Sequence, residues 1–306
     1  MTASLSNMPS TIDVLCIGHA SYDLVFSLAH HPEADEKTTA DKLLGCGGGP
    51  AANAAVTVAR LGCVAAFSGY LGGDIYGDSH LKELQAEGVD TRLVVRGGAP
   101  TPLSVVLVKP DGKRALINYK GETKALPSNS VNFSGIYPKV VLFDGHEPDL
   151  SLSFLEQACG KIPAVLDAGS LHGGTLALMG KVDYLVCSEK FALQYAGDEH
   201  AALSRLAELA PVVVITLGER GLIWRRGADS GNIPAPQVSA IDSTGAGDAF
   251  HGAFAAAVSV GMEWLDVLHY AGIAGALCCT QMGARPGLPN YRQHQALSRQ
   301  WLSADD

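Results

Sequence analysis

From residue 139 onward the chain alternates short apolar runs with helical stretches, and this alternation constrains the fold more than any other feature. The apolar runs lie at 139–143, 164–167, 182–187 and 212–217, with helical periodicity at 149–160 and 189–210 between them. Short continuous apolar runs are typical of strands buried on both faces, and intervening helices are typical of parallel crossovers. The alternation therefore predicts an α/β protein with a mainly parallel sheet that helices cover on both faces.

Two earlier segments, about 22–46 and 96–122, lack the helical rhythm. Strand-like runs at 103–108 and 115–119 flank a Pro110-Asp111-Gly112 turn, which is a strong hairpin signal. The sequence shows no internal repeat and no interdomain linker. We therefore expect one domain over residues 1–306, with the two segments forming a small β-sheet lid inserted in it.

Composition excludes several classes of function. The net charge of −9 argues against nucleic acid or an anionic membrane surface as the main partner. The seven cysteines are odd in number, scattered and never spaced as C-x-x-C, as expected for reduced thiols and not for a zinc site. The first residues do not resemble a signal peptide, and no apolar run reaches membrane-spanning length. We expect a soluble, cytoplasmic protein.

The stretch Asp242-Ser-Thr-Gly-Ala-Gly-Asp248 carries the clearest chemical signal. It leads into an apolar helical run at 249–260 that Gly261 is suited to end. The backbone N–H groups of Gly245, Ala246 and Gly247 would lie where a helix begins, which is a favourable site for an anion. Asp248 in the first turn could then take a proton from an attacking hydroxyl. The alternative is a tight turn followed by an acidic residue that the helix N-terminus favours.

Two further segments place polar residues beside expected strand ends or helix starts. Asp23 follows the apolar run 12–17, and ligands of open α/β sheets collect beyond the carboxyl ends of strands. Gly48 and Gly49 precede a helix that begins near Pro50, with Asn53 in its first turn. Pro50 breaks a dinucleotide-binding G-x-G-x-x-G pattern, and G-x-x-x-x-G-K-[ST] occurs nowhere in the chain.

Taken in order, these motifs resemble those of the ribokinase-like (PfkB) carbohydrate kinases over roughly residues 12–290. The resemblance rests on the Asp23 segment, Gly-Gly-x-x-x-Asn at 48–53, Thr-Leu-Gly-x-x-Gly at 216–221 and the stretch 242–248. It implies a doubly wound, Rossmann-like core with a β-sheet lid that closes over a sugar, and a homodimer formed through that lid. It also implies ATP and Mg²⁺ as cofactors and, in many members, a bound monovalent cation such as K⁺.

The resemblance assigns roles to individual positions. Asp248 matches the catalytic base, and the amides of residues 245–247 match the anion hole. The positions matched to the sugar are Ser21, Asp23, Gly48, Gly49 and Asn53. The positions matched to the nucleotide are Ser188, Thr216, Gly218, Gly221, Gly272 and Ala276. Those matched to a monovalent cation are Asp242, Thr244 and Gly283, the last in the loop 283–287.

The chain departs from the family pattern after the expected strand at 182–187. Many members carry Asn-x-x-Glu there, whose glutamate helps to order Mg²⁺ and phosphate, whereas this chain has Ser188 and Phe191. Other segments are similar to the subgroup that contains sulfofructose kinase, in which Lys37, Asn118 and His146 match positions near the anionic end of the substrate. The imidazole of His146 would bind a sulfonate less tightly than a bidentate guanidinium does, so the sequence does not identify a sulfosugar as the substrate.

The leading hypothesis is an ATP-dependent kinase that phosphorylates a hydroxyl, expected to be a primary one, of a sugar or sugar derivative. A nucleoside kinase is the alternative within this class, but the lid segments offer few aromatic residues for stacking a base. A catalytically silent sugar- or nucleotide-binding regulator is the alternative from another class, favoured by Ser188 and Phe191 and disfavoured by Asp248. A dinucleotide-dependent oxidoreductase ranks last because its fingerprint is broken.

Overall fold

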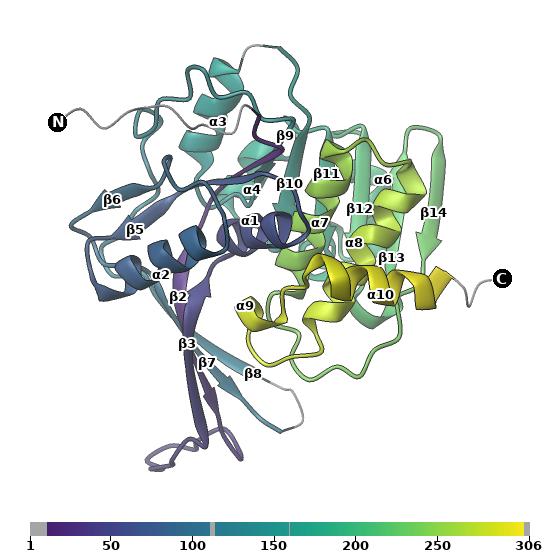
Figure 1. Cartoon of the computed structure of the whole chain (residues 1–306). Helices are drawn as coiled ribbons and strands as arrows, with labels where there is room; N and C mark the ends of the chain where they lie inside the picture. The colour runs from purple at the N-terminus through teal and green to yellow at the C-terminus, as the bar shows by residue number, and fades with distance from the viewer. Residues whose placement is uncertain (1–10, 111–113, 159, 303–306) are drawn as a thin grey trace.

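The computed structural model describes residues 11–110, 114–158 and 160–302. In these residues the main sheet has eight strands in the order β14-β13-β12-β11-β10-β9-β1-β4, of which only β13 runs antiparallel to the other seven (Figure 1). The strands are β1 (Val14–Ile17), β4 (Ala65–Ser68), β9 (Val140–Phe143), β10 (Ala164–Ala168), β11 (Tyr184–Ser188), β12 (Val212–Thr216), β13 (Leu222–Arg226) and β14 (Asp229–Ile233). The expected mainly parallel sheet is confirmed.

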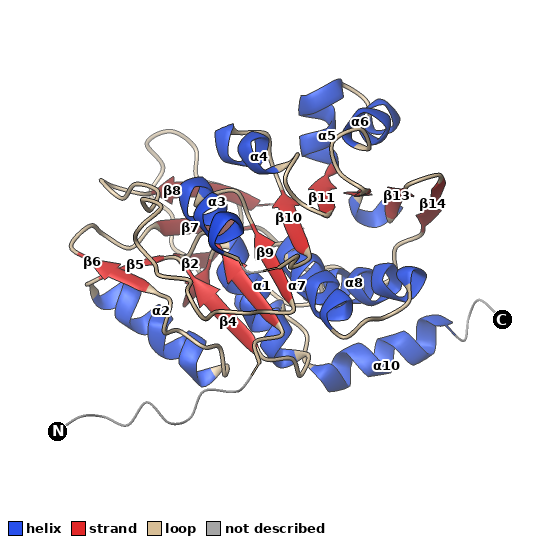
Figure 2. Cartoon of the chain, turned by 90° about the horizontal axis from the view of Figure 1, so that it is seen from above, coloured by secondary structure: helices blue, strands red, loops and turns tan. Residues whose placement is uncertain are grey.

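Alternate residues of each central strand face two separate hydrophobic cores. Val14 and Cys16 of β1 pack into one core, and Leu15 and Ile17 pack into the other, as the two-residue period of a strand requires. Helices cover both faces, as Figure 2 shows from above. One face carries α1 (Pro50–Arg60), α7 (Ala246–Ser259) and α8 (Trp264–Cys278); the other carries α3 (Pro148–Gln157), α4 (Gly173–Leu178), α5 (Glu189–Ala196) and α6 (Glu199–Leu206).

A second sheet projects from one edge of this core (Figure 1). Its strand order is β3-β2-β7-β8, with β2 (Ser21–Ser27), β3 (Lys42–Gly48), β7 (Leu103–Val108) and β8 (Arg114–Tyr119). The expected antiparallel pairing of the two strands is confirmed, with Leu103 of β7 opposite Tyr119 of β8. Asp111 and Gly112 of the expected turn lie outside the described residues. β2 continues directly from β1 and β3 leads directly into α1, so this sheet is anchored at the edge where the parallel strands end.

The remaining elements lie beside these two sheets. A two-stranded sheet joins β5 (Tyr70–Gly72) to β6 (Val95–Gly97), and α2 (Ile75–Ala86) connects these two strands. Two C-terminal helices follow α8, namely the short α9 (Ala284–Gly287) and α10 (Tyr291–Leu302). The longest helix of the described residues has 15, and none of them is both long and apolar enough to cross a membrane.

Three local features add detail to the expected fold. Residues 237–241 are β-prone in sequence but form no strand, and their backbone passes along a cavity described below. The segment 22–46 holds two seven-residue strands, as the expected β-sheet lid requires. β14 gave no signal because its sequence, DSGNI, has a single β-branched residue, and its strand conformation comes from antiparallel pairing with β13.

Candidate active site

The N-terminus of α7 organises the site. Gly245 is the N-cap residue with φ of 79°, in the left-handed region, and a Cβ there would lie 2.6 Å from Cβ of Ala284. Glycine is therefore required both by the backbone conformation and by the close approach of α9. The first turn of α7 contains Ala246, Gly247 and Asp248, and N–H groups of a first helical turn have no partner within the helix. The turn thus offers donors to an anion beside a carboxylate.

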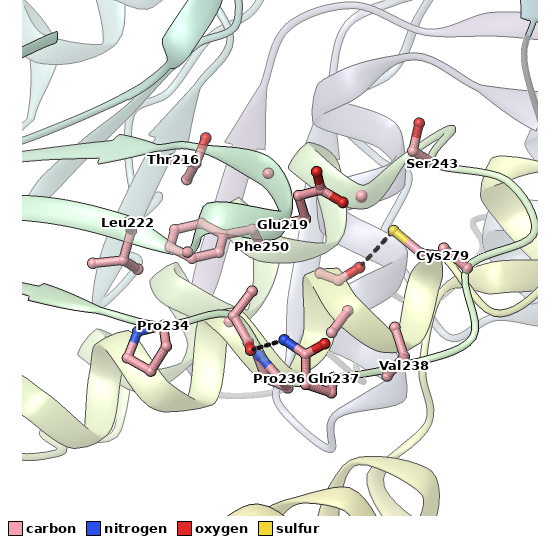
Figure 3. A pocket seen from close by; sticks show the side chains of 18 of the residues that line it. Thr216, Glu219, Leu222, Pro234, Pro236, Gln237, Val238, Ser243, Phe250 and Cys279 are labelled. Carbon is pink, nitrogen blue, oxygen red and sulfur yellow. Dashed lines mark hydrogen bonds between the residues drawn. The ribbon is translucent and has the colours of Figure 1, made fainter.

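Two cavities meet at this turn. The larger, about 480 Å³, includes Ser243, Ala246 and Gly247, and the smaller, about 300 Å³, includes Thr244 and Asp248. The larger cavity is lined mainly by apolar side chains and by backbone; Figure 3 shows Thr216, Leu222, Phe250, Ser243 and Cys279 among the residues that surround it. Its floor is the chain from Pro234 to Val238, which sequence analysis did not identify as part of the site.

The smaller cavity lies between the core and the second sheet and is lined by titratable and polar side chains. β2 contributes Ser21 and Asp23, α1 contributes Asn53, and the second sheet closes the cavity with residues of β7 and β8. The polar residues that line it are His19, Ser21, Asp23, Asn53, Ser104, Asn118, Lys120, His146, Thr244 and Asp248. A cavity of this size and polarity fits a small ligand with several hydroxyl groups.

Among the described residues, the Asp248 carboxylate has one side-chain hydrogen-bond partner. Its Oδ2 accepts a hydrogen bond of 2.7 Å from Nδ2 of Asn53. Burial raises the pKa of the Asp248 carboxyl, while the Asn53 amide opposes that rise. A carboxylate with a raised pKa and free lone pairs is suited to take a proton from a bound hydroxyl.

Asn53 is in turn oriented by Arg285 of α9. Nε and one terminal nitrogen of the Arg285 guanidinium each donate to Oδ1 of Asn53 at 3.2 Å. Because a guanidinium only donates, the amide oxygen must face Arg285, and the NH₂ group must face Asp248. Arg285 is 2% exposed, and its charge lies 3.3 Å from Oε1 of Glu83. This buried arginine was missed by sequence analysis, which considered the loop 283–287 only as part of a cation site.

Asp23 lies across the same cavity in a different environment. Its Oδ1 accepts a hydrogen bond of 2.9 Å from Oγ of Ser21, and Ser104 is a second hydroxyl partner. Burial raises the pKa of Asp23 to about 6, with the negative charge of Asp248 adding to the rise. Gly48 packs against this carboxylate, and a Cβ at position 48 would lie 2.2 Å from Oδ2 of Asp23. Gly48 thus makes room for the carboxylate and does not itself line the cavity.

Asp144, which sequence analysis also missed, fixes two loops and the start of α1 around the cavity. It follows β9, and its Oδ2 accepts from the backbone N–H of His19 at 2.7 Å and of Ala51 at 3.1 Å. Its Oδ1 accepts from the N–H of His146 at 2.9 Å. The signal that could have found it is its position, because it directly follows an expected strand as Asp23 nearly does.

The positions matched to the nucleotide fall into two groups. Thr216, Gly218, Gly221, Gly272 and Ala276 all line the larger cavity. Ser188 does not line it; its Oγ accepts from the N–H of Phe191 at 3.1 Å and donates to the carbonyl of Gly169 at 2.9 Å. It caps α5, while Phe191 is fully buried in the core. Residues 188–191 therefore hold no side chain that could replace the family's Asn-x-x-Glu, because Glu189 pairs with Arg220 at 2.9 Å.

The positions matched to the sugar are also mostly brought together. Ser21, Asp23, Gly49, Asn53, Asn118 and His146 line the smaller cavity. Lys37 does not; it lies exposed in the loop between β2 and β3. The three positions matched to a monovalent cation are neighbours, since Oδ1 of Asp242 accepts from the N–H of Thr244 at 2.9 Å, and Oδ2 accepts from the N–H of Gly283 at 2.8 Å. In the described residues no group of three or more His, Cys, Asp or Glu side chains is placed to hold a metal ion.

Comparisons with known proteins agree with this geometry. The model of the pfkB family of carbohydrate kinases matches residues 11–290. Ribokinase of Bacillus subtilis is 28% identical over 290 residues, covering 93% of this chain and 99% of the relative. Probable fructokinase-5 of Arabidopsis thaliana is 27% identical over 289 residues, covering 82% and 88%. The structure of Arabidopsis thaliana ribokinase complexed with ribose and ATP superposes with a TM-score of 0.82 at 23% identity, covering 94% and 99%. The chain thus belongs to the pfkB family of carbohydrate kinases, enzymes that transfer a phosphoryl group to an alcohol.

Proposed function

We propose that this chain transfers the γ-phosphoryl group of ATP to a hydroxyl, expected to be a primary one, of a sugar or sugar derivative. The observation that carries the proposal is the position of Asp248. Its carboxylate lines the smaller, polar cavity, while the amides of the same helical turn line the larger, mainly apolar one. A hydroxyl in the first cavity and a triphosphate in the second would meet at this turn.

In the proposed reaction the substrate hydroxyl gives its proton to Asp248. The oxygen then forms a bond to the γ-phosphorus, and the bond from that phosphorus to the bridging oxygen of ADP breaks. The amides of Gly245, Ala246 and Gly247 would stabilise the charge on the transferring group, as preorganised N–H donors do. Asn53 keeps Asp248 in place through its 2.7 Å hydrogen bond.

We propose that Mg²⁺ arrives as part of the MgATP substrate. Magnesium retains several waters and is commonly held by substrate phosphates together with one or two carboxylates. Ser188 and Phe191, at the positions where many relatives carry Asn-x-x-Glu, are used as a helix cap and a core residue. Asp167, near the end of β10, is buried at 6% exposure and lies 3.3 Å from Nδ1 of His251, which leaves little room for a hydrated ion.

For the sugar, we propose that Asp23 and Asn53 bind hydroxyls from opposite sides of the smaller cavity. Asp23 is an acceptor, and the Asn53 amide is a donor. Asn118 and His146 line the part of the cavity beside Lys120, where a more polar or charged end of the substrate would lie. The relatives named ribokinase and fructokinase support a monosaccharide, and the subgroup that contains sulfofructose kinase stays a prediction.

We also propose that the sheet β3-β2-β7-β8 is the lid and that two chains pair through it in the cytoplasm. Leu43 and Ile117, on the outer two strands, are each 61% exposed, which is unusual for large apolar residues and suits a covered surface. Light scattering after gel filtration measures the mass directly. A monomer at micromolar concentration would contradict the dimer and leave the proposed reaction unaffected.

The decisive experiment is a screen of ADP release with MgATP across hexoses, pentoses, sugar acids, sulfosugars and nucleosides. We expect one class of sugar to stimulate release and the Asp248→Asn variant to lose that stimulation. Stimulation by nucleosides alone would contradict the sugar assignment. A variant as fast as the natural protein would remove Asp248 from the reaction.

A further inference from the structure

Arg114, on the second sheet, contacts the loop that carries the anion hole. It begins β8, and its guanidinium donates a hydrogen bond to Oγ1 of Thr244, 130 residues further along the chain. The same nitrogen lies 3.9 Å from Oδ1 of Asp242. Arg114 shares one face of β8 with Leu116 and Asn118, both of which line the smaller cavity, so its side chain reaches the loop across that cavity's rim.

The partner of this arginine is a buried carboxylate whose oxygens are already occupied. The Asp242 side chain is 0% exposed. Its Oδ1 accepts from the N–H of Thr244 at 2.9 Å and from Oγ1 of Thr244 at 2.6 Å, and its Oδ2 accepts from the N–H of Gly283 at 2.8 Å. These hydrogen bonds satisfy the oxygens but do not neutralise the charge. A buried charge is costly unless an opposite charge lies beside it.

The same face of the sheet also packs against the loop that contains Gly283. Val25 and Val108 form a small apolar cluster with Leu44, and Met282 packs against that cluster. A Cβ at Gly283 would lie 3.2 Å from Cδ2 of Leu44. Arg114 is therefore held at Asp242 by a continuous contact between sheet and loop, and the contact places its charge where a small cation would otherwise be expected.

We propose that Arg114 is a built-in cation that replaces the soluble monovalent ion bound by many relatives. It is a positioning residue: its charge balances Asp242 and so fixes the loop 242–247, whose amides form the anion hole. Because Arg114 belongs to the lid, the loop 242–247 adopts its catalytic conformation only when the lid contacts it. The catalytic consequence rests on the proposed function, whereas the charge replacement itself does not.

The arrangement does not fit an additional K⁺ at the same three residues. The hydroxyl of Thr244 already donates to Asp242 and accepts from Arg114, and each Asp242 oxygen faces an N–H donor. A potassium ion would have to displace Arg114 to reach these oxygens. The chain should consequently work without K⁺, and removal of Arg114 should create a K⁺ requirement.

The test compares the natural protein with Arg114→Ala, Arg114→Lys and a matched control, Lys42→Ala. Lys42, Ser27, Val108 and Arg114 form one row across the sheet, so Lys42 carries the same charge on the opposite edge strand. Three strand spacings place it about 14 Å from Arg114. Thermal unfolding is measured for each protein in KCl and in tetramethylammonium chloride at equal ionic strength, and ADP release with the best sugar is measured in the same two salts.

We expect KCl to shift the unfolding temperature of the natural protein, of Lys42→Ala and of Arg114→Lys by less than about 1 °C. For Arg114→Ala we expect a K⁺-specific rise of about 2–4 °C, as for an ion that binds only the folded state. Its rate should fall at least about tenfold without K⁺ and recover in part with it, because the loop geometry and not the proton transfer is affected.

A natural protein that K⁺ stabilises or activates as strongly as it does Arg114→Ala would overturn the proposal, and so would an Arg114→Ala variant that behaves like Lys42→Ala. The unfolding measurements need no substrate. If no sugar stimulates ADP release, the proposed function fails, while the comparison of unfolding temperatures still decides whether Arg114 replaces the ion.

Discussion

The two cavities that meet at α7 differ in their lining, so in the proposed reaction they would recognise their ligands by different means. The larger one is lined by small and apolar residues such as Gly272, Ala276 and Phe250, together with backbone groups. The smaller one is lined by Asp23, Asn53 and other polar side chains that contact one another. A nucleotide would be held mainly by shape and by main-chain donors, which a single substitution changes little. The reacting hydroxyl would be held by side chains that contact one another, so a single substitution can remove one of its contacts.

The two cavities should also differ in how much their side chains contribute to the free energy of unfolding. Burial raises the pKa values of Asp23 and Asp248, so in both cases the folded protein disfavours the ionised carboxylate. The larger cavity holds no comparable buried acid among its described lining residues. We therefore expect substitutions in the smaller cavity to change stability and activity in opposite directions. Substitutions in the larger one that leave the first turn of α7 undisturbed should change either only slightly.

The largest effect is expected from Asp248→Asn. The amide has nearly the same shape and cannot take a proton, so kcat should fall by about 10²–10⁴ while the KM for ATP changes by no more than about threefold. Steady-state ADP release measures both constants. If only the KM for the sugar changed, Asp248 would bind the sugar without taking its proton. The proposed difference in role between the two cavities would then be wrong.

The next largest effect is expected from Arg285→Met, which removes the buried charge behind Asn53. The variant removes the ion pair with Glu83, which is 27% exposed and keeps the N–H of Gly47 at 2.6 Å, and leaves the buried Asn53 oxygen without its partner. An unsatisfied buried acceptor costs about 1–3 kcal/mol in unfolding free energy. We expect kcat/KM for the sugar to fall about 10²-fold because the Asn53 amide is then free to rotate away from Asp248. Urea unfolding and sugar kinetics test the two effects separately.

Arg299→Met is the control for this variant, since Arg299 lies exposed in α10. Arg285→Lys adds a finer comparison, because lysine keeps the charge without the planar fork that donates twice to Asn53. It should retain most of the stability and little of the sugar affinity. If Arg285→Met and Arg285→Lys each lost stability and sugar affinity to the same extent, Arg285 would have only a structural role.

The difference between local and distant contacts also explains what the sequence could predict. The parallel sheet, the antiparallel strand pair β7–β8 and the glycine-rich start of α7 are encoded by neighbouring residues, and all three are confirmed. The resemblance added most of the residues that line the cavities, but its match of Lys37 and Ser188 lies away from both.

The residues that were missed act over long separations in the chain. Arg285 lies 232 residues from Asn53, Arg114 lies 130 residues from Thr244, and Asp144 lies 125 residues from His19. No periodicity or short motif reports which of several arginines or aspartates will meet a given partner, because that depends on how the sheet, the lid and α9 pack together. These contacts became visible only in the folded chain.

A third prediction concerns Asp23→Asn. The folded pKa of about 6 lies above the ordinary value of 3.8, so folding favours the protonated form of this acid. Its contribution to stability is therefore unfavourable above pH 6, shrinks as the pH falls towards 4 and is absent below that. Replacing Asp23 by Asn should raise the unfolding free energy by about 1–3 kcal/mol at pH 7.5 and by almost nothing at pH 4.

The same variant should bind sugar at least about tenfold less tightly, because an ionised acceptor of hydroxyl protons is lost. In the natural protein kcat/KM should fall as the pH drops below about 6, where Asp23 becomes protonated. Urea unfolding at the two pH values and a pH profile of kcat/KM test these statements. A variant that is less stable at pH 7.5 would show that Asp23 supports the fold and would break the contrast between the cavities.

The smallest effects are expected in the larger cavity, from Gly272→Ala and Gly275→Ala in α8. Alanine within a helix is favoured over glycine by about 0.5–1 kcal/mol, so both variants start with the same gain in stability. At Gly272 the nearest neighbour of an added Cβ is Cδ of Pro236 at 4.0 Å, an ordinary contact, and at Gly275 it is the carbonyl oxygen of Ala246 at 3.2 Å. Gly272→Ala should keep its stability gain and raise the KM for ATP by no more than about threefold, since the nucleotide is held by the whole surface and not by one group.

Gly275→Ala places its Cβ against the first turn of α7 and should lower kcat instead, because the amides of that turn must stay in position for the transferring phosphoryl group. If Gly272→Ala abolished ATP binding, the larger cavity would depend on one close contact after all, as the smaller one does.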